Sequence, residues 1–270
     1  MKKMFAAAVL IAFASVGVFA HPYEAFNIVM SRSPYLVSLG ANTDDSVADK
    51  KLDKFASNVG QAIGGGSFGN SFGLTSFGFN LSIKMSYQQV GSEDAIVNKN
   101  GDTAIYYPII QGEFSVFENL TSVARFSYSN DSFVFGGGFK YKLNDGYGYI
   151  PTLSVQSIYN YLIADIDDVY KFLPKEIYNY DRIKFNAWNL KNAVMAFFPE
   201  TPYVKPYVFL SYDITGLHAI TSDRAGASSI VSGIGYGAGG TISLDPVNLN
   251  FTISMYDGSP NYNFGIFFGF

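Results

Sequence analysis

Alternation of apolar and polar residues is the main pattern of the chain from residue 72 onward. In the clearest stretch every odd position from Phe77 to Tyr87 is apolar, and every even position from Gly78 to Gln88 is small or polar. A period of two places the apolar side chains on one face of a β-strand and the polar side chains on the other. The pattern therefore predicts a strand at residues 72–89 with one apolar face.

The same alternation predicts nine further strands. They lie at residues 105–117, 120–129, 133–143, 149–162, 183–198, 203–213, 229–244, 247–255 and 261–270. Short segments rich in Asn, Asp, Gly and Pro separate some of them, and three longer segments lie at residues 90–103, 163–182 and 214–228. The apolar positions of residues 183–198 change parity partway, which predicts a β-bulge near Asn186.

Ten such strands predict an all-β fold, a transmembrane antiparallel up-and-down β-barrel preceded by an amphipathic helix. An even count brings both ends of the strand array to one side of the membrane, and bacterial barrels place short turns on that periplasmic side and longer loops outside. With the C-terminus in the periplasm, all three long segments fall outside. A soluble β-sandwich is the alternative, and it gives no reason for this distribution of loop lengths.

Charged residues of the predicted strands share the polar parity. A lysine or arginine on the lipid-facing side costs about 2–4 kcal/mol at the bilayer centre, so these side chains are expected to point into the barrel lumen. The lumen-facing candidates are Lys84, Glu113, Arg125, Lys140 and Lys142. The aromatic faces of the strands are then left to membrane lipid.

The C-terminal tail carries a large apolar residue at every second position. These residues are Tyr262, Phe264, Ile266, Phe268 and Phe270. Such a tail resembles the terminal signal of bacterial outer-membrane β-barrels, which the barrel-assembly machinery reads in that family. With the strand sequences at residues 135–143 and 202–207, nearly the whole mature chain resembles small outer-membrane barrels with a helix before the first strand. The resemblance implies outer-membrane localisation, with lipid and the assembly machinery as partners.

A different period precedes the first strand. In residues 49–63 the apolar positions Leu52, Phe55, Val59 and Ile63 follow helical spacing, which predicts an amphipathic helix. Gly64, Gly65 and Gly66 end it, and a flexible hinge is expected as far as residue 73. The helix is expected to act as a plug in the lumen or across its periplasmic mouth. A helix on the membrane surface or free in the periplasm is the alternative.

Residues 235–240 match the letters of a dinucleotide-binding fingerprint, but that motif needs a strand, a tight turn and a helix. Here the glycines instead belong to a period-two run inside one predicted strand. The run places Gly233, Gly235, Gly237 and Gly239 on the lumen face. They either make room for a bulky group inside the barrel or ease the curvature of the strand.

The N-terminal sequence predicts export. Residues 1–20 have two lysines, a short apolar run and a small residue at position 20, as in a cleaved signal peptide. The expected domains are thus this signal peptide, an N-terminal segment at residues 21–71 and the barrel at residues 72–270. The chain has no cysteine, and removal of Lys2 and Lys3 changes its formal charge from −4 to −6, which favours no nucleic-acid partner.

Candidate catalytic and metal-binding residues are few. Some ten-stranded outer-membrane barrels are proteases with paired acidic residues and an Asp-His couple, but His218 has no such neighbour in sequence and is expected in a loop. Asp165, Asp167 and Asp168 could bind calcium, although a solvated acidic face is the preferred interpretation. The sequence predicts no enzyme activity and no cofactor. It favours a narrow or gated channel for small or amphipathic solutes, with a closed surface-binding or structural barrel as the alternative.

Overall fold

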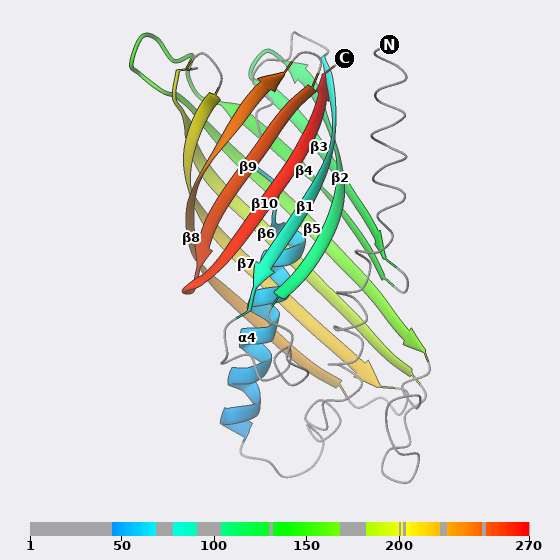
Figure 1. Ribbon diagram of the computed structural model, residues 1–270. Helices are drawn as coiled ribbons and strands as arrows, with labels where there is room; N and C mark the ends of the chain where they lie inside the picture. Colours follow the sequence, from blue (N-terminus) through cyan, green and yellow to red (C-terminus); the bar gives the residue numbers. More distant parts are fainter. Residues whose placement is uncertain are drawn as a thin grey trace.

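The computed structural model describes residues 45–68, 78–90, 104–129, 132–167, 182–199, 201, 204–221, 226–244 and 247–269. Ten antiparallel strands form a closed barrel in which β1 pairs with β10 (Figure 1). The elements are α4 (Asp45–Gly64), β1 (Phe79–Gln89), β2 (Ala104–Phe117), β3 (Leu120–Ser129), β4 (Ser132–Lys142), β5 (Thr152–Asp167), β6 (Arg182–Phe197), β7 (Val204–Thr221), β8 (Gly226–Leu244), β9 (Val247–Tyr256) and β10 (Ser259–Gly269). The predicted up-and-down barrel with a preceding helix is confirmed.

Helix α4 is longer at its start than the helical pattern predicts, and it ends at the predicted glycines. Phe55, Val59 and Ile63, spaced by one turn, are all buried. Gly66 follows the last turn with φ +62°, a left-handed conformation that glycine adopts without steric cost and that commonly terminates helices.

Strands β7 and β8 extend well beyond their predicted ends. The predicted loop at residues 214–228 is wrong for residues 214–221 and 226–228, because the antiparallel pairing continues without a break from Ile214 opposite Ser232 to Ile220 opposite Gly226. Residues 222–225 fall outside the described residues. The sequence loses its clear alternation in this region, since Gly216 and Ala219 are small. Backbone hydrogen bonding to a regular neighbour maintains the strand nonetheless.

The β-bulge predicted near Asn186 is absent from the described pairing of β6. Its register is continuous with β5 and with β7. Ala187 and Asn189 both point inward and are buried, and Ala187 packs in an apolar cluster around α4. The parity change in the sequence therefore reflects a lumen that is apolar at one level and polar at another, so no extra residue is needed.

The outer surface of the barrel is apolar and the inner surface carries most of the polar side chains. Exposed positions include Phe114, Phe126, Phe135, Phe139, Leu210, Ile234, Phe251 and Phe264. A closed barrel leaves no unpaired strand edge, and an apolar belt of this kind faces lipid in outer-membrane barrels. Among the described residues, no helix is long and apolar enough to cross a membrane.

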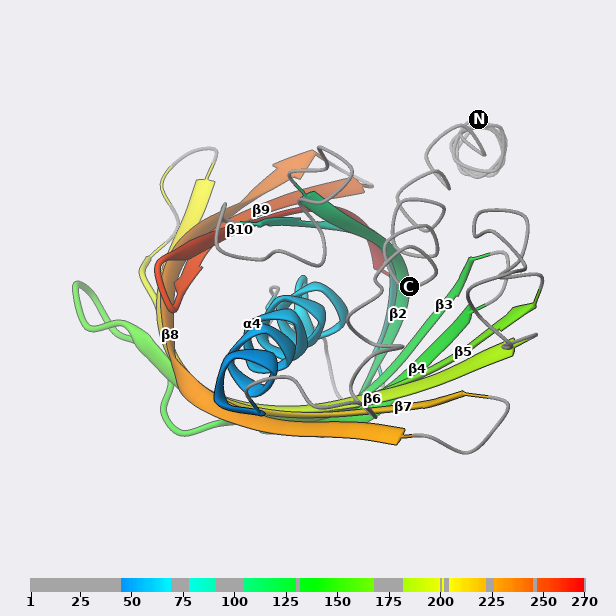
Figure 2. The same cartoon turned by 90° about the horizontal axis from the view of Figure 1, so that it is seen from below.

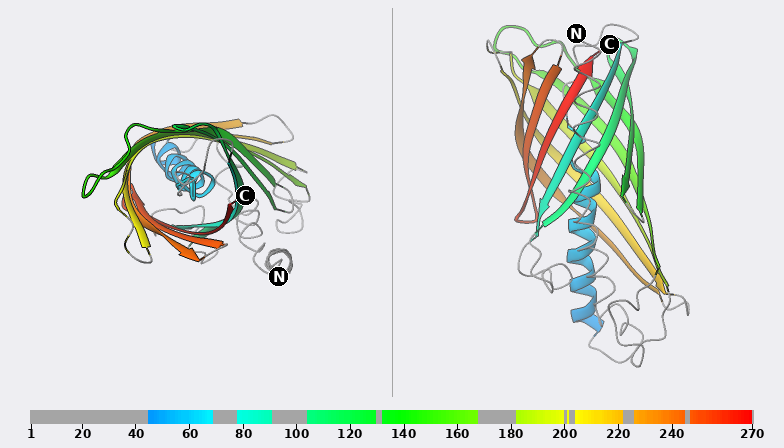
Figure 3. Two further views of the ribbon diagram at one scale, coloured as in Figure 1. Left: turned by 90° about the horizontal axis from the view of Figure 1, so that it is seen from above. Right: turned by 45° about the vertical axis from the view of Figure 1, so that its right-hand side comes forward.

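The view along the barrel shows α4 inside the ring of strands (Figures 2 and 3). It contacts β6, β7 and β8 most extensively. These three strands and β5 have 16 to 19 residues each, whereas the other six have 10 to 14. We call β5–β8 the long-strand wall. It extends past the rest of the barrel at the end opposite the C-terminus (Figure 1).

Candidate functional site

The carbonyl end of α4 is bound by two cationic side chains of the barrel. Arg125 on β3 donates from Nη1 to the carbonyl oxygen of Ile63 at 3.2 Å and from Nη2 to that of Gly65. Lys84 on β1 donates to the carbonyl oxygen of Gly66 at 2.7 Å. The last carbonyl groups of a helix lack partners within it and carry partial negative charge, so cations stabilise this end. The contacts fix the C-terminal end of α4 inside the barrel.

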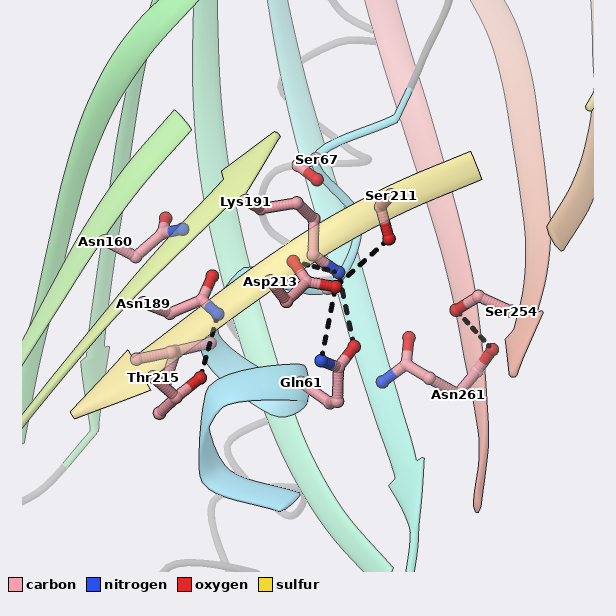
Figure 4. Close-up of polar contacts among 12 residues, drawn as sticks. Gln61, Ser67, Asn160, Asn189, Lys191, Ser211, Asp213, Thr215, Ser254 and Asn261 are labelled. Carbon is pink, nitrogen blue, oxygen red and sulfur yellow. Dashed lines mark hydrogen bonds and ion pairs between the residues drawn. The ribbon is translucent and has the colours of Figure 1, made fainter. Parts of the chain in front are cut away.

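A third cation, Lys191 on β6, contacts the last turns of α4 from another side (Figure 4). Its Nζ donates to Gln61 Oε1 at 3.3 Å and lies 3.6 Å from Asp213 Oδ1. Gln61 Nε2 donates to Asp213 Oδ2 at 3.5 Å, and Ser211 Oγ donates to the same oxygen at 3.0 Å. Because Lys191 and Asp213 are both buried, their attraction and these hydrogen bonds offset the cost of removing two charges from water.

A second buried ion pair joins β2 and β4. Lys140 Nζ lies 2.6 Å from Glu113 Oε1, and neither side chain has any exposed surface. Gln111 Nε2 donates to the same carboxylate oxygen at 2.5 Å. The pair connects strands that are not neighbours, since β3 lies between them. It therefore braces the barrel across its interior.

The described lumen contains more cations than anions. Its buried charged side chains are the cations Lys84, Arg125, Lys140 and Lys191 and the anions Glu113 and Asp213. The two anions pair with Lys140 and Lys191. The other two cations contact main-chain carbonyl groups of α4 and of the residues that follow it. The helix end thus supplies part of the negative charge that the barrel side chains lack.

Away from these charged groups, one side of α4 is surrounded by apolar barrel residues. Phe55, Val59 and Ile63 of α4 pack in one buried cluster with residues near the ends of several strands. The barrel residues of this cluster include Val90, Ile105, Tyr107, Ile109, Val134, Leu162, Ala187 and Leu217. The apolar face of α4 is therefore buried against apolar side chains of the barrel, and the two surfaces are complementary.

Phe68 packs against β6 and β7 just beyond the helix. Its ring stacks on Phe209 with centroids 3.7 Å apart, and Lys84 Nζ donates to its carbonyl oxygen at 3.3 Å. Phe197, Tyr207 and the other members of the same buried cluster surround it. The predicted flexible hinge is therefore wrong for residues 65–68, which are buried and bonded. The remainder of the hinge, residues 69–73, falls outside the described residues.

Glycines allow α4 to approach the barrel wall closely. A Cβ atom at Gly60 would lie 1.9 Å from Thr215 Oγ1, and one at Gly64 would lie 2.4 Å from Asn189 Oδ1. Side-chain atoms do not approach to such distances, so either substitution must move the helix or the wall. Gly60 and Gly64 thus let the last turns of α4 lie directly against β7 and β6.

The glycine row of β8 faces rings of the neighbouring strands. A Cβ atom at Gly237 would lie 2.5 Å from Phe209 Cζ, and one at Gly239 would lie 2.5 Å from Tyr207 Cζ. Of the other two, Gly233 faces Tyr256 on β9 and Gly235 faces Ser211 on β7. The groups packed against the row thus come from β7 and β9 rather than from α4.

A cavity of about 390 Å³ lies between α4 and β8 at the end away from the C-terminus. Its lining includes Asp53, Lys54 and Ser57 from the helix and Val231 and Gly233 from the strand. The helix therefore does not fill the lumen completely on this side.

The remaining residues singled out in the sequence lie apart from this centre. Lys142 is at the barrel rim, where it pairs with Asp145 at 2.6 Å. His218 is wrongly expected in a loop: it lies in β7, exposed, with Nδ1 2.7 Å from Ser228 Oγ. Asp165 and Asp167 belong to β5 rather than to a loop, and Asp168 falls outside the described residues. Within the described part of the chain, no group of three or more potential ligands is placed to bind a metal ion.

In the C-terminal strand, Tyr262 and Phe264 are exposed on the outer face, Ile266 is half-buried and Phe268 is buried. Phe270 falls outside the described residues, as do the side chain of Leu52 and the proposed signal peptide. Of the lumen groups, the sequence did not single out Gln61, Phe68, Lys191, Tyr207 or Asp213. Lys191 and Asp213 have the polar parity of their strands, which was the available signal.

The sequence matches no protein-family model and no curated protein. Solved structures similar to the chain are outer-membrane barrels. The translocator domain of the autotransporter NalP from Neisseria meningitidis has a TM-score of 0.42 and 10% identity, over 84% of this chain and 97% of that one. Ail, the attachment invasion locus protein of Yersinia pestis in complex with a heparin analogue, has a TM-score of 0.37 and 11% identity, over 72% of this chain and 98% of that one. Neisserial surface protein A has a TM-score of 0.36 and 11% identity, over 72% of this chain and 97% of that one.

Proposed function

We propose that this protein is a gated outer-membrane channel that passes small or amphipathic solutes when α4 is displaced. In the described conformation α4 and Phe68 occupy the lumen, so the resting channel is closed. Residues 1–20 direct export and are removed, and the aromatic C-terminal strand is read by the barrel-assembly machinery. The protein has no catalytic role in this proposal.

One observation carries the proposal: Lys84 and Arg125 are bound to main-chain carbonyl groups at and beyond the end of α4. A structural filler needs only an apolar face, whereas these contacts can be exchanged for water or for a solute anion when the helix moves. Displacement would leave four buried cations against two buried anions in the part of the lumen that the structure describes, a surplus of two positive charges. The open lumen is then expected to select anions, since clustered charge concentrates counter-ions in a low-dielectric channel.

An engineered disulfide gives the direct test. Ser229 Oγ donates to Asp53 Oδ1 at 2.5 Å, so the substitutions Asp53→Cys and Ser229→Cys place two thiols side by side between α4 and β8. The chain has no cysteine of its own, so no other pairing competes. Conductance of the refolded mature protein in planar bilayers would be recorded with the disulfide intact and after reduction.

We expect no current from the oxidised protein and discrete current steps after reduction. The single variants Asp53→Cys and Ser229→Cys serve as controls, because they should conduct equally with and without reductant. Silence after reduction, with the barrel shown to be folded by circular dichroism and protease resistance, would rule the channel out.

A closed barrel with a surface role is the second candidate. The long-strand wall favours it, because β7 and β8, with 18 and 19 residues, are longer than a membrane crossing of about 9–11 residues requires. The parts of β7 and β8 that extend beyond the membrane would offer a rigid surface for a partner to bind. Silent bilayers from all variants would make this the preferred function.

A further inference from the structure

The direction in which α4 runs through the barrel is determined by its contacts. At the middle of the helix, Lys54 Nζ lies 3.2 Å from Asp257 Oδ2, and Asp53 accepts a hydrogen bond from Ser229. Asp257 is in the β9–β10 turn, and Ser229 is near the start of β8. Both therefore lie at the barrel end opposite Gly269, the last residue of β10.

The residues after the helix contact the other half of the barrel. Gln156 Nε2 donates to Ser67 Oγ at 3.4 Å, and the ring of Phe68 stacks on Phe209. Gln156 is near the beginning of β5 and Phe209 near the beginning of β7, at the end where β10 finishes. The chain thus runs from the β9–β10 turn towards the C-terminal end of the barrel before it enters β1.

Loop lengths identify the two ends. The longest connections, residues 90–103 and 168–181, leave the barrel at the end of the β9–β10 turn, and the long-strand wall extends there as well. The four connections at the C-terminal end, residues 118–119, 143–151, 198–203 and 245–246, have two to nine residues, fewer than the 14 of each of those two. Outer-membrane barrels place longer loops outside the cell and short turns in the periplasm. The β9–β10 turn is accordingly at the outer face.

Asp45, the first residue of α4, is farther out than the contacts of Asp53 and Lys54. Asp53 is eight positions after Asp45, which corresponds to about 12 Å of helix at 1.5 Å per residue. The first turns of α4 extend beyond the ends of β1, β9 and β10 (Figures 1 and 3). They project from the outer mouth rather than from the periplasmic one.

We infer that Asp45, at the start of α4, lies at the outer face of the cell, and that the barrel displays this end of the helix on the surface with the rest of α4 as the threaded stem. A chain exported through the inner membrane begins in the periplasm, so the start of α4 reaches the outer face through the closed ring of strands. The contacts of Lys84 and Arg125 with the carbonyl end of α4 then stop the chain at a fixed position. Surface display is a function distinct from conduction and does not depend on the proposed channel.

Labelling of single cysteines on intact cells tests the inference. Ser46→Cys reports on the first turn of α4. Asp257→Cys reports on the β9–β10 turn, and the Asp257 side chain is 68% exposed. Asp145→Cys reports on the β4–β5 connection at the C-terminal end, with a side chain that is 83% exposed. A membrane-impermeant maleimide would be applied before and after permeabilisation of the outer membrane.

We expect Ser46→Cys and Asp257→Cys to be labelled on intact cells, and Asp145→Cys only after permeabilisation. If Ser46→Cys is labelled only after permeabilisation, as expected for Asp145→Cys, the inference is overturned. Labelling of Asp145→Cys on intact cells would overturn it as well. Formation of the Asp53→Cys, Ser229→Cys disulfide in the same cells is the second measurement. If that disulfide does not form, the helix is not threaded as described and the inference fails even when residue 46 is labelled.

Discussion

Arg125 on β3 donates a hydrogen bond to the main-chain carbonyl oxygen of Ile63, 3.2 Å away in the last turn of α4. The two residues are 62 positions apart in the chain, and the contact is buried. The same guanidinium also binds the carbonyl of Gly65, so one planar side chain satisfies two groups. The relationship makes Arg125 the principal connection between the barrel and the end of the helix.

The first prediction concerns this contact. Arg125→Met should free the end of α4, because a hydrogen bond to a charged donor contributes about 1.5–3 kcal/mol. Ser67→Cys, at a fully buried position, provides the probe. Its maleimide labelling should become at least about tenfold faster in the Arg125→Met background. Arg125→Lys, which keeps the charge but not the planar pair of donors, should give an intermediate rate, and equal rates in all three would contradict the assigned role.

The second prediction tests the close approach of helix and wall. Gly60→Ala should destabilise the seated helix by about 1–3 kcal/mol, because the new Cβ atom would meet Thr215. Thr215→Gly removes all three atoms that the Cβ would approach, so the double variant should recover the parental behaviour. Denaturant unfolding in detergent and the labelling rate of residue 67 give the readouts.

Gly112→Ala on β2 is the matched control for that series. A Cβ atom there would approach Phe79 to 3.4 Å, a distance at which a small adjustment suffices. Its stability and labelling rate should equal those of the parent. If Gly60→Ala behaves in the same way, α4 does not pack against Thr215.

The sequence predicts the strands and the helix well because both have regular periods. Lys84 and Arg125 stand out on a clean polar parity, whereas Lys191 lies in a stretch where apolar and polar residues exchange faces. The exchange arises because the lumen contains a helix with one apolar side, and no periodicity within β6 can reveal that neighbour. Phe68 gave no sequence signal for a related reason: it lies in a glycine-rich segment, and its place is set by contacts with residues distant in the chain, such as Phe209 and Lys84.

The third prediction concerns the buried pair of Lys140 and Glu113. Lys140→Met leaves Glu113 as an uncompensated buried charge, which costs about 3–5 kcal/mol when a buried pair is broken. The double variant Glu113→Gln, Lys140→Met removes both charges and should recover most of that stability. Denaturant midpoints of the parent, both single variants and the double variant form a complete cycle. Additive effects of the two substitutions would show that the side chains do not interact.

The fourth prediction is the ion selectivity of the reduced Asp53→Cys, Ser229→Cys protein. With the helix displaced, the buried charges of the described lumen are four cations and two anions, so the reversal potential in a salt gradient should indicate preference for chloride over potassium. Lys84→Gln and Arg125→Gln together remove the two cations that the helix end had satisfied, which leaves two buried cations against two buried anions among the described lumen residues. That variant should lose the preference. Lys142→Gln removes a positive charge at the rim, where it pairs with Asp145, and should leave the reversal potential nearly unchanged. A preference for chloride that survives the loss of Lys84 and Arg125 would mean that these cations do not line the conducting path.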